Sequence, residues 1–115
     1  MNRSSSQEEP GYKSITPAGL KEKLDRGEKP TLLDVRESWE FQRARIEGSK
    51  LVPMYEVLDR LIELDPASET VVICHRGARS AYVALLLSRS GFVAAYNLEG
   101  GLDAYSFVDS SVPRY

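Results

Sequence analysis

The sequence has 115 residues, of which 42% are hydrophobic and 28% charged, and its formal net charge is −2. This length and composition predict one globular domain with its own core, and the near-zero charge argues against nucleic acid or a membrane surface as the partner. The single cysteine excludes an internal disulfide, and with the single histidine it gives too few ligands for a structural zinc site, so we expect no metal and a reducing, cytoplasmic setting.

The amino-terminal stretch is polar and lacks an apolar core, so we expect no secretory signal in it. Residues 1–11 are rich in Ser and Glu and predict a disordered tail, so the folded domain is expected over residues 12–115. The first predicted helix begins at Thr16, which can cap it, and Pro17 suits the first turn. Gly27 is a natural end for this helix.

The middle of the chain predicts two strands and two helices. The apolar run 31–35 is typical of a strand covered on both faces. A short helix follows, with Ser38 as a candidate cap, and residues 51–52 form a weak strand. Residues 55–65 predict an amphipathic helix because apolar and charged residues alternate at helical spacing.

The last part of the chain gives the strongest strand, residues 70–74, and then a largely buried helix that closes at Gly91. The longest apolar run, 81–87, lies in this helix and is far shorter than the roughly 20 residues that span a membrane. Residues 93–98 predict another strand, and 101–108 a final short helix. This alternation of strands and helices predicts an α/β fold with a mainly parallel sheet.

The stretch "CHRGARS", Cys74 to Ser80, joins the strongest strand to the following helix. Ligands of parallel sheets lie beyond the carboxyl ends of the strands, and the amides of such a turn can form an anion-binding concavity. Gly77 permits a tight turn, while Arg76 and Arg79 add positive charge. Because cations and helix N-termini favour the thiolate form of cysteine, we expect Cys74 to be a nucleophile.

Less specific interpretations remain open for each of these residues. A lone cysteine at a strand end is often a buried, inert thiol. His75 is better explained as a partly exposed loop side chain than as a catalytic base, because sequence neighbours on a tight loop usually point apart. Arg76 or Arg79 can be merely solvated, although we expect at least one of them to attract an anion.

Four stretches together resemble a single-domain rhodanese: "LLDVRESWEF" at 32–41, "CHRGARS" at 74–80, "GF" at 91–92 and "YNLEGGLDAY" at 96–105. The resemblance implies the rhodanese-like three-layer fold, a five-stranded, mainly parallel sheet with helices on both faces.

The resemblance also implies the activity of a thiosulfate sulfurtransferase that needs no cofactor. Cys74 would take a sulfane sulfur from thiosulfate or a persulfide donor and pass it to cyanide or to a thiol or protein acceptor. Asp34 and Arg36 would be structural residues near the site. The loop that would hold the persulfide consists of His75, Arg76, Gly77, Ala78, Arg79 and Ser80.

The sequence departs from the rhodanese pattern at three positions. Arg45 stands where a structural His is common, Glu47 where Pro is common, and Tyr105 where Trp is frequent. None of these positions is catalytic in the family, so they put local packing in question rather than the chemistry. Glu99 and the pair Gly100–Gly101 are expected to shape a turn near the active loop.

Three alternative functions compete with sulfur transfer. A phosphatase or arsenate reductase would need five residues between its cysteine and arginine, whereas four separate Cys74 from Arg79. A docking module or partner-dependent sulfur carrier is the other main alternative, although docking relatives often lack the cysteine that is present here. A peroxide sensor is disfavoured because the chain has no second cysteine to resolve an oxidised one.

Overall fold

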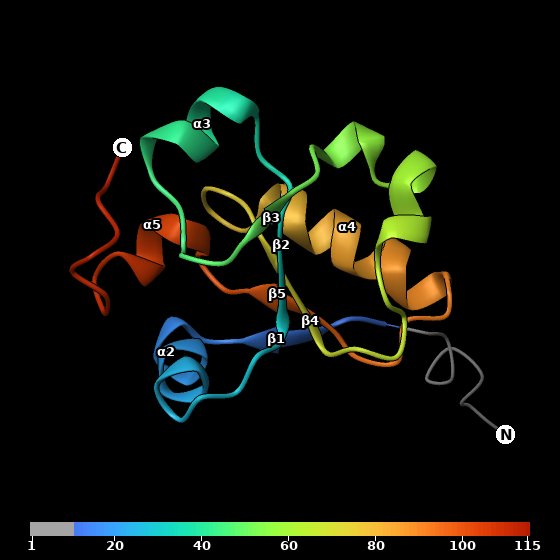
Figure 1. Ribbon diagram of the computed structural model, residues 1–115, viewed down its shortest axis with the longest axis horizontal. Coiled ribbons are helices and arrows are strands. Elements are labelled where there is room, and N and C mark those ends of the chain that lie inside the picture. The colour runs from blue at the N-terminus through green and yellow to red at the C-terminus, as the bar shows by residue number, and fades with distance from the viewer. Residues whose placement is uncertain (1–10) are drawn as a thin grey trace, which may run out of the picture.

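The computed structural model describes residues 11–115, so all but the last residue of the predicted tail lies outside the described residues. The chain folds around a five-stranded sheet in the order β1-β5-β4-β2-β3, and every neighbouring pair is parallel (Figure 1). The predicted α/β fold is therefore confirmed, with a sheet that is parallel throughout. The strands are β1 (Lys13–Ile15), β2 (Thr31–Asp34), β3 (Lys50–Leu51), β4 (Thr70–Ile73) and β5 (Ala95–Leu98).

Helices connect successive strands, as parallel pairing requires. Among residues 11–115, no helix is both long enough and apolar enough to cross a membrane. The α-helices are α2 (Pro17–Asp25), α3 (Ser38–Arg43), α4 (Ala78–Arg89) and α5 (Gly101–Tyr105), and two 3-10 helices are η1 (Met54–Glu56) and η2 (Leu58–Glu63).

The sheet is buried on both faces, because its strands point alternate residues into two separate cores. In β4, Val71 and Ile73 belong to the core beneath α2 and α5. Val72 and the following Cys74 point to the opposite core, beneath α4 and the 3-10 helices. This alternation explains why the central strands read as continuous apolar runs, and it directs the cysteine towards α4.

The first strand was not recognised in the sequence. β1 is only three residues long, lies at the edge of the sheet and pairs with β5 alone. Its residues Lys13 and Ser14 are exposed, so no apolar run marks it.

The predicted cap of α3 is displaced by one residue, because Glu37 is the cap and Ser38 is the first helical residue. The amide of Glu37 is held there by the Glu40 carboxylate at 3.0 Å.

The predicted amphipathic helix over residues 55–65 is wrong in its type. The segment forms η1 and η2, with a kink at Arg60, whose φ is −117°. Val57 and Leu64 are buried as the pattern indicates, but Ile62 is 95% exposed. In a 3-10 helix, side chains point the same way every three residues. Only some of the apolar residues of this segment therefore face the core.

Candidate active site

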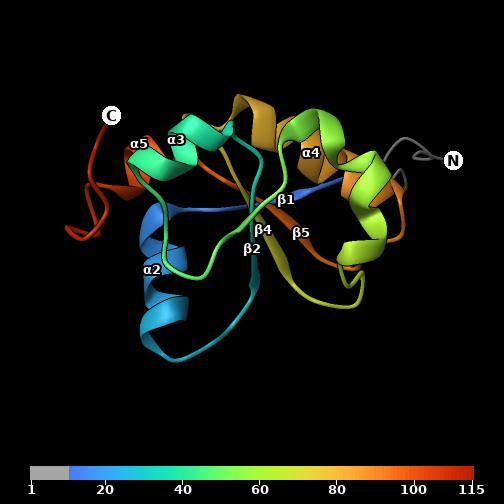
Figure 2. The same ribbon diagram turned by 45° about the horizontal axis from the view of Figure 1, so that its top comes forward.

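Cys74 lies directly after β4, where the chain leaves the sheet for α4. Its side chain is 1% exposed and belongs to the apolar core on the α4 side. The helix α3 lies beyond the carboxyl end of the sheet, on the same side as the loop that leads into α4 (Figure 2). The sulfur therefore sits at the floor of this loop rather than on the surface.

Two hydrogen-bonding groups of the loop converge on the sulfur. The amide of Gly77 donates to Cys74 Sγ at 3.0 Å, and Ser80 Oγ lies 3.2 Å from the same atom. The Ser80 hydroxyl is fully buried and also contacts Asn97 Oδ1 at 2.5 Å. Because a hydroxyl has one proton, it can donate either to Asn97 or to the sulfur, but not to both.

The loop contains three further amide donors. Ala78, Arg79 and Ser80 begin α4, so their amides have no intrahelical acceptor. Within residues 11–115 these three amides have no other hydrogen-bond acceptor either. Gly77 precedes them with φ at +107°, a left-handed conformation that side chains disfavour. The predicted cradle thus has one amide bonded to sulfur and three at a helix N-terminus that carries partial positive charge.

Backbone hydrogen bonds attach the beginning of the loop to α5. The carbonyl groups of Cys74 and His75 accept hydrogen bonds from the amides of Leu102 and Asp103, at 2.8 and 3.0 Å. A side chain at Gly101 would collide with the backbone of His75 and Arg76. The expected turn at Gly100–Gly101 therefore lies directly against the loop, and Gly101 is required for their close approach.

Arg79, expected to receive an anion, is already paired with a carboxylate. Its guanidinium makes a double hydrogen bond with Glu40 of α3, at 2.8 and 3.0 Å. The Glu40 side chain is 5% exposed. The hydrogen bonds from Arg79 lower the pKa of Glu40 to about 2, against the opposing effect of burial. Much of the Arg79 charge is therefore neutralised by Glu40.

Asp34 and Arg36 form a buried ion pair behind the loop. Both side chains are fully buried, and Arg36 bonds Asp34 through Nε at 2.8 Å and through Nη2 at 2.7 Å. Arg36 also donates to the Ala44 carbonyl at 2.6 Å. These contacts satisfy both charges inside the protein, so the pair holds the β2–α3 connection and is not available to a substrate.

Arg76 and His75 have opposite surroundings. Arg76 is exposed, and its guanidinium makes no ion pair or hydrogen bond with residues 11–115. The ring of His75 is partly buried and stacks on Tyr115, with centroids 4.3 Å apart and planes at 24°. His75 Nε2 has no hydrogen-bond partner among the described residues. Arg76 is therefore the loop cation whose charge no residue within 11–115 neutralises.

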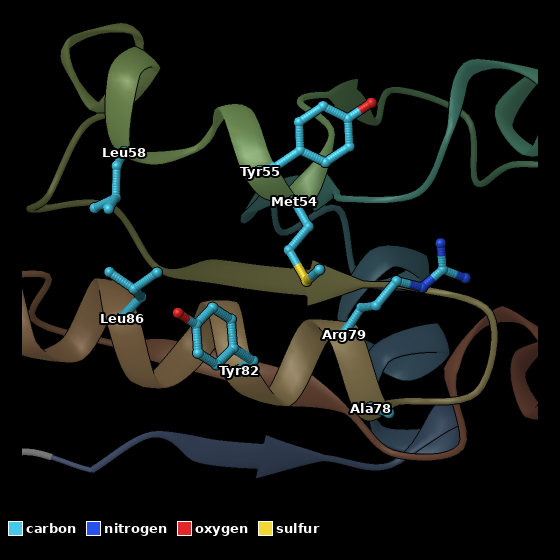
Figure 3. Close-up of a pocket in the computed structure, with 7 residues that line it drawn as sticks. All are labelled: Met54, Tyr55, Leu58, Ala78, Arg79, Tyr82 and Leu86. Carbon is cyan, nitrogen blue, oxygen red and sulfur yellow. The ribbon is translucent and has the colours of Figure 1, made fainter.

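An apolar pocket of about 640 Å³ opens between the 3-10 helices and α4. Met54 and Leu58 point across it towards Leu86 and Tyr82 on α4 (Figure 3). Its lining consists of Met54, Tyr55, Leu58, Ala78, Arg79, Tyr82 and Leu86. Because Ala78 and Arg79 belong to both the pocket and the start of α4, the pocket adjoins the loop that holds the sulfur.

Three residues near the loop were not identified from the sequence: Glu40, Asn97 and Tyr115. Glu40 follows Glu37 at capping-box spacing, and this was an available signal. Asn97 interrupts an otherwise apolar strand, and a buried polar residue of this kind requires a partner. No local pattern marks Tyr115, which lies 40 residues beyond His75 in the sequence.

The departures from the rhodanese pattern are accommodated by local contacts. Ile46 is buried, whereas Arg45 and Glu47 on either side of it are exposed. The Arg45 guanidinium lies 4.7 Å from the centre of the Phe41 ring. Tyr105 is 1% exposed within the core beneath α5, so it fills a buried position there.

Comparison with known proteins agrees with this geometry. Three curated relatives illustrate the range of lengths. A rhodanese-like/PpiC domain-containing protein 12 from Arabidopsis thaliana is 40% identical over 73% of this chain and 30% of its own length. The putative sulfur carrier protein YrkF of Bacillus subtilis is 35% identical over 85% of this chain and 53% of its own length. The putative sulfurtransferase YtwF of the same organism is 37% identical over 81% and 89%. The chain thus spans about half or less of the first two relatives.

Solved structures give the same result. A rhodanese-like domain protein from Staphylococcus aureus superposes with a TM-score of 0.80 at 33% identity, over 90% of this chain and 98% of that one. A rhodanese-related protein from Thermoplasma volcanium gives 0.79 at 31% identity. The rhodanese-like domain family matches residues 16–107. The chain therefore belongs to the rhodanese-like domain family.

Proposed function

We propose that this protein is a sulfurtransferase that carries sulfane sulfur on Cys74. The Cys74 thiolate attacks the outer sulfur of thiosulfate, a new S–S bond forms, and sulfite leaves with the electron pair of the broken bond. A nucleophilic acceptor then attacks the terminal sulfur of the persulfide and releases the Cys74 thiolate. With cyanide as acceptor, the product is thiocyanate. A persulfide donor would enter at the first step in place of thiosulfate, and a reducing, cytoplasmic setting suits the free thiol.

One observation carries the proposal, namely the set of donors that faces the Cys74 sulfur. The Gly77 amide bonds the sulfur, the Ser80 hydroxyl lies beside it, and three further amides at the start of α4 have no acceptor within residues 11–115. Such donors stabilise negative charge on sulfur both before and after it gains a second sulfur atom. A buried cysteine with no chemical role would not require these hydrogen-bond donors.

Arg76 is the residue that we propose to attract the anionic donor. Its guanidinium is exposed and unpaired within residues 11–115, whereas that of Arg79 is bound to Glu40. Arg79 then serves mainly to hold α3 against the first turn of α4. The shared role that the sequence indicated for both arginines is thereby divided between them.

Mass spectrometry after thiosulfate treatment tests the chemistry directly. We expect the protein to gain the mass of one sulfur atom, to carry it on Cys74, and to lose it again when cyanide is added. The Cys74→Ser variant is the control and should gain no sulfur while it keeps the fold. Sulfur transfer at the wild-type rate by this variant would remove Cys74 from the mechanism.

Phosphatase activity is disfavoured by the same loop. A tetrahedral oxyanion requires a larger ring with an arginine that encircles it, whereas four residues separate Cys74 from Arg79 and that arginine pairs with Glu40. A phosphate ester should therefore be hydrolysed no faster by the protein than by its Cys74→Ser variant.

The apolar pocket favours a second candidate function, a sulfur carrier that acts on a protein partner. Leu58 is 59% exposed, and Tyr55 and Tyr82 are 69% and 60% exposed beside the loop. Exposed aromatic and aliphatic side chains around a cavity are typical of partner-binding sites. A protein that presents a cysteine next to an apolar side chain would fit both the pocket and the loop.

A charged side chain introduced into the pocket distinguishes a sulfurtransferase for small acceptors from a sulfur carrier for a protein partner. Leu58→Lys should slow sulfur transfer to a protein bearing an exposed cysteine and leave transfer to cyanide unchanged. Val93→Lys is the matched control, because Val93 is apolar, 69% exposed and outside the pocket lining. Equal transfer to the protein acceptor by both variants would refute the carrier function.

A further inference from the structure

Tyr115 contacts the active-site loop at its first turn. Its ring stacks on His75, the residue after the nucleophile, with centroids 4.3 Å apart. The guanidinium carbon of Arg36 lies 5.3 Å from the centre of the same ring. Trp39 meets the ring edge-on at 6.2 Å. The ring therefore fills the space between the loop, the end of β2 and α3.

The hydroxyl of Tyr115 reaches the opposite end of the loop through Glu40. It donates to Glu40 Oε2 at 2.9 Å and accepts from Arg36 Nη1 at 2.8 Å. Glu40 in turn bonds both terminal nitrogens of Arg79. Burial raises the pKa of Tyr115 to about 12, so the hydroxyl keeps its proton and remains a donor at neutral pH.

Through these contacts Tyr115 links both ends of the cradle and its two supporting ion pairs. It touches His75 directly, and it reaches Arg79 through Glu40. It also joins the Asp34–Arg36 pair to the Glu40–Arg79 pair. Gly77, whose amide bonds the sulfur, lies between these fastened ends, so the position of its amide depends on both attachments.

We propose that Tyr115 is a positioning residue for sulfur transfer, which holds the Cys74–Ser80 loop in its cradle conformation by stacking on His75 and by fixing Glu40 against Arg79. The proposal rests on the sulfur-transfer function of Cys74. It assigns no chemical step to Tyr115, which has no contact with the sulfur among the described interactions. Its effect on the reaction is to keep the donors in place, because misplaced donors stabilise a developing charge poorly.

Two substitutions separate the ring from the hydroxyl. Tyr115→Phe keeps the stack on His75 and removes the hydrogen bonds to Glu40 and Arg36, and kcat with thiosulfate and cyanide should fall about threefold. Tyr115→Ala removes both contacts and should lower kcat about tenfold. Tyr12→Phe is the control, because Tyr12 is exposed and lies outside these contacts.

The single histidine and the single cysteine supply two readouts that do not require turnover. The imidazole NMR signal of His75 reports its stacking, so it should stay close to wild type in Tyr115→Phe and shift in Tyr115→Ala. At alkaline pH, where thiols in general are ionised, iodoacetamide should alkylate Cys74 about threefold faster in Tyr115→Ala, because Cys74 is only 1% exposed behind an ordered loop in the wild type.

A purely structural role is distinguished by Leu20→Ala, which opens a cavity at a fully buried residue of α2 away from the loop. This variant should melt at a lower temperature and keep the wild-type kcat when measured well below that temperature. If Tyr115→Ala behaves in the same way, with an unchanged His75 signal and alkylation rate, the proposal is overturned. If Tyr115→Ala does not fold, kcat of Tyr115→Phe decides: a fall of about threefold supports the proposal, and wild-type kcat overturns it.

Failure of the proposed sulfur-transfer function would give other results than failure of the positioning role of Tyr115. A wild-type protein that gains no sulfur from any donor would refute sulfur transfer through Cys74. The His75 signal and the Cys74 alkylation rate would still report whether Tyr115 holds the loop, and no change in either would refute the positioning role by itself.

Discussion

Neutralising Glu40 should destabilise the fold by about 3 kcal/mol at neutral pH. The pKa of Glu40 falls from its ordinary value of 4.5 to about 2, mainly because Arg79 donates two hydrogen bonds to it. At about 1.4 kcal/mol for each power of ten, this fall corresponds to about 3 kcal/mol of unfolding free energy at pH 7. Glu40→Gln mimics the neutral form, so it should lose this amount.

The lowered pKa of Glu40 also determines how the loss of unfolding free energy in Glu40→Gln depends on pH. Because the folded-state pKa lies below the unfolded value, folding favours the charged carboxylate, and its contribution is fully present above about 4.5. It decreases as pH falls, to about 1.4 kcal/mol at pH 3 and about 0.4 kcal/mol at pH 2. The stability gap between wild type and Glu40→Gln should close over this range.

Urea unfolding of both proteins between about pH 2 and pH 7 measures the gap. Glu47→Gln is a matched control, because Glu47 is exposed and forms no ion pair within residues 11–115. Its unfolding free energy should follow that of the wild type throughout. A gap for Glu40→Gln that stays below about 1 kcal/mol at pH 7, or that does not narrow on acidification, would refute the assigned role of the Glu40–Arg79 pair.

Three further substitutions test the loop and its support. Arg76→Ala should raise the KM for thiosulfate about fivefold, equal to about 1 kcal/mol of exposed charge attraction, without changing the melting temperature, and steady-state kinetics in low salt will detect it. Gly101→Ala should destabilise the fold by more than about 2 kcal/mol and slow sulfur transfer, because a methyl group there collides with the backbone of the loop, and urea unfolding together with the thiosulfate–cyanide assay measures both effects. Leu87→Ala should lower the unfolding free energy by about 2–5 kcal/mol, since the side chain is fully buried, and a loss below about 1 kcal/mol would contradict its place in the core.

Local sequence signals located most of the elements that carry the site. The strand predicted over 70–74 is β4, the buried helix predicted after it is α4, which begins at Ala78, and the predicted cap at Thr16 is confirmed. The signals failed where burial depends on neighbours distant in sequence. β1 exists because β5 offers it an edge, and the 3-10 turns after Pro53 are selected by packing against α4 rather than by the periodicity of their residues.

The amino-acid sequence alone is enough to predict that Cys74 follows a buried strand, that a glycine and two arginines share its loop, and that a helix comes next. Such features depend on residues next to one another in the chain, so local propensity and spacing are enough to identify them. Which arginine is neutralised could not be predicted in this way, because Glu40 lies 39 residues from Arg79 and reaches it only when α3 is folded over the loop. The stacking of Tyr115 on His75 could not be predicted either, since contacts between distant segments are selected by complementary packing in three dimensions and leave no local pattern in the sequence.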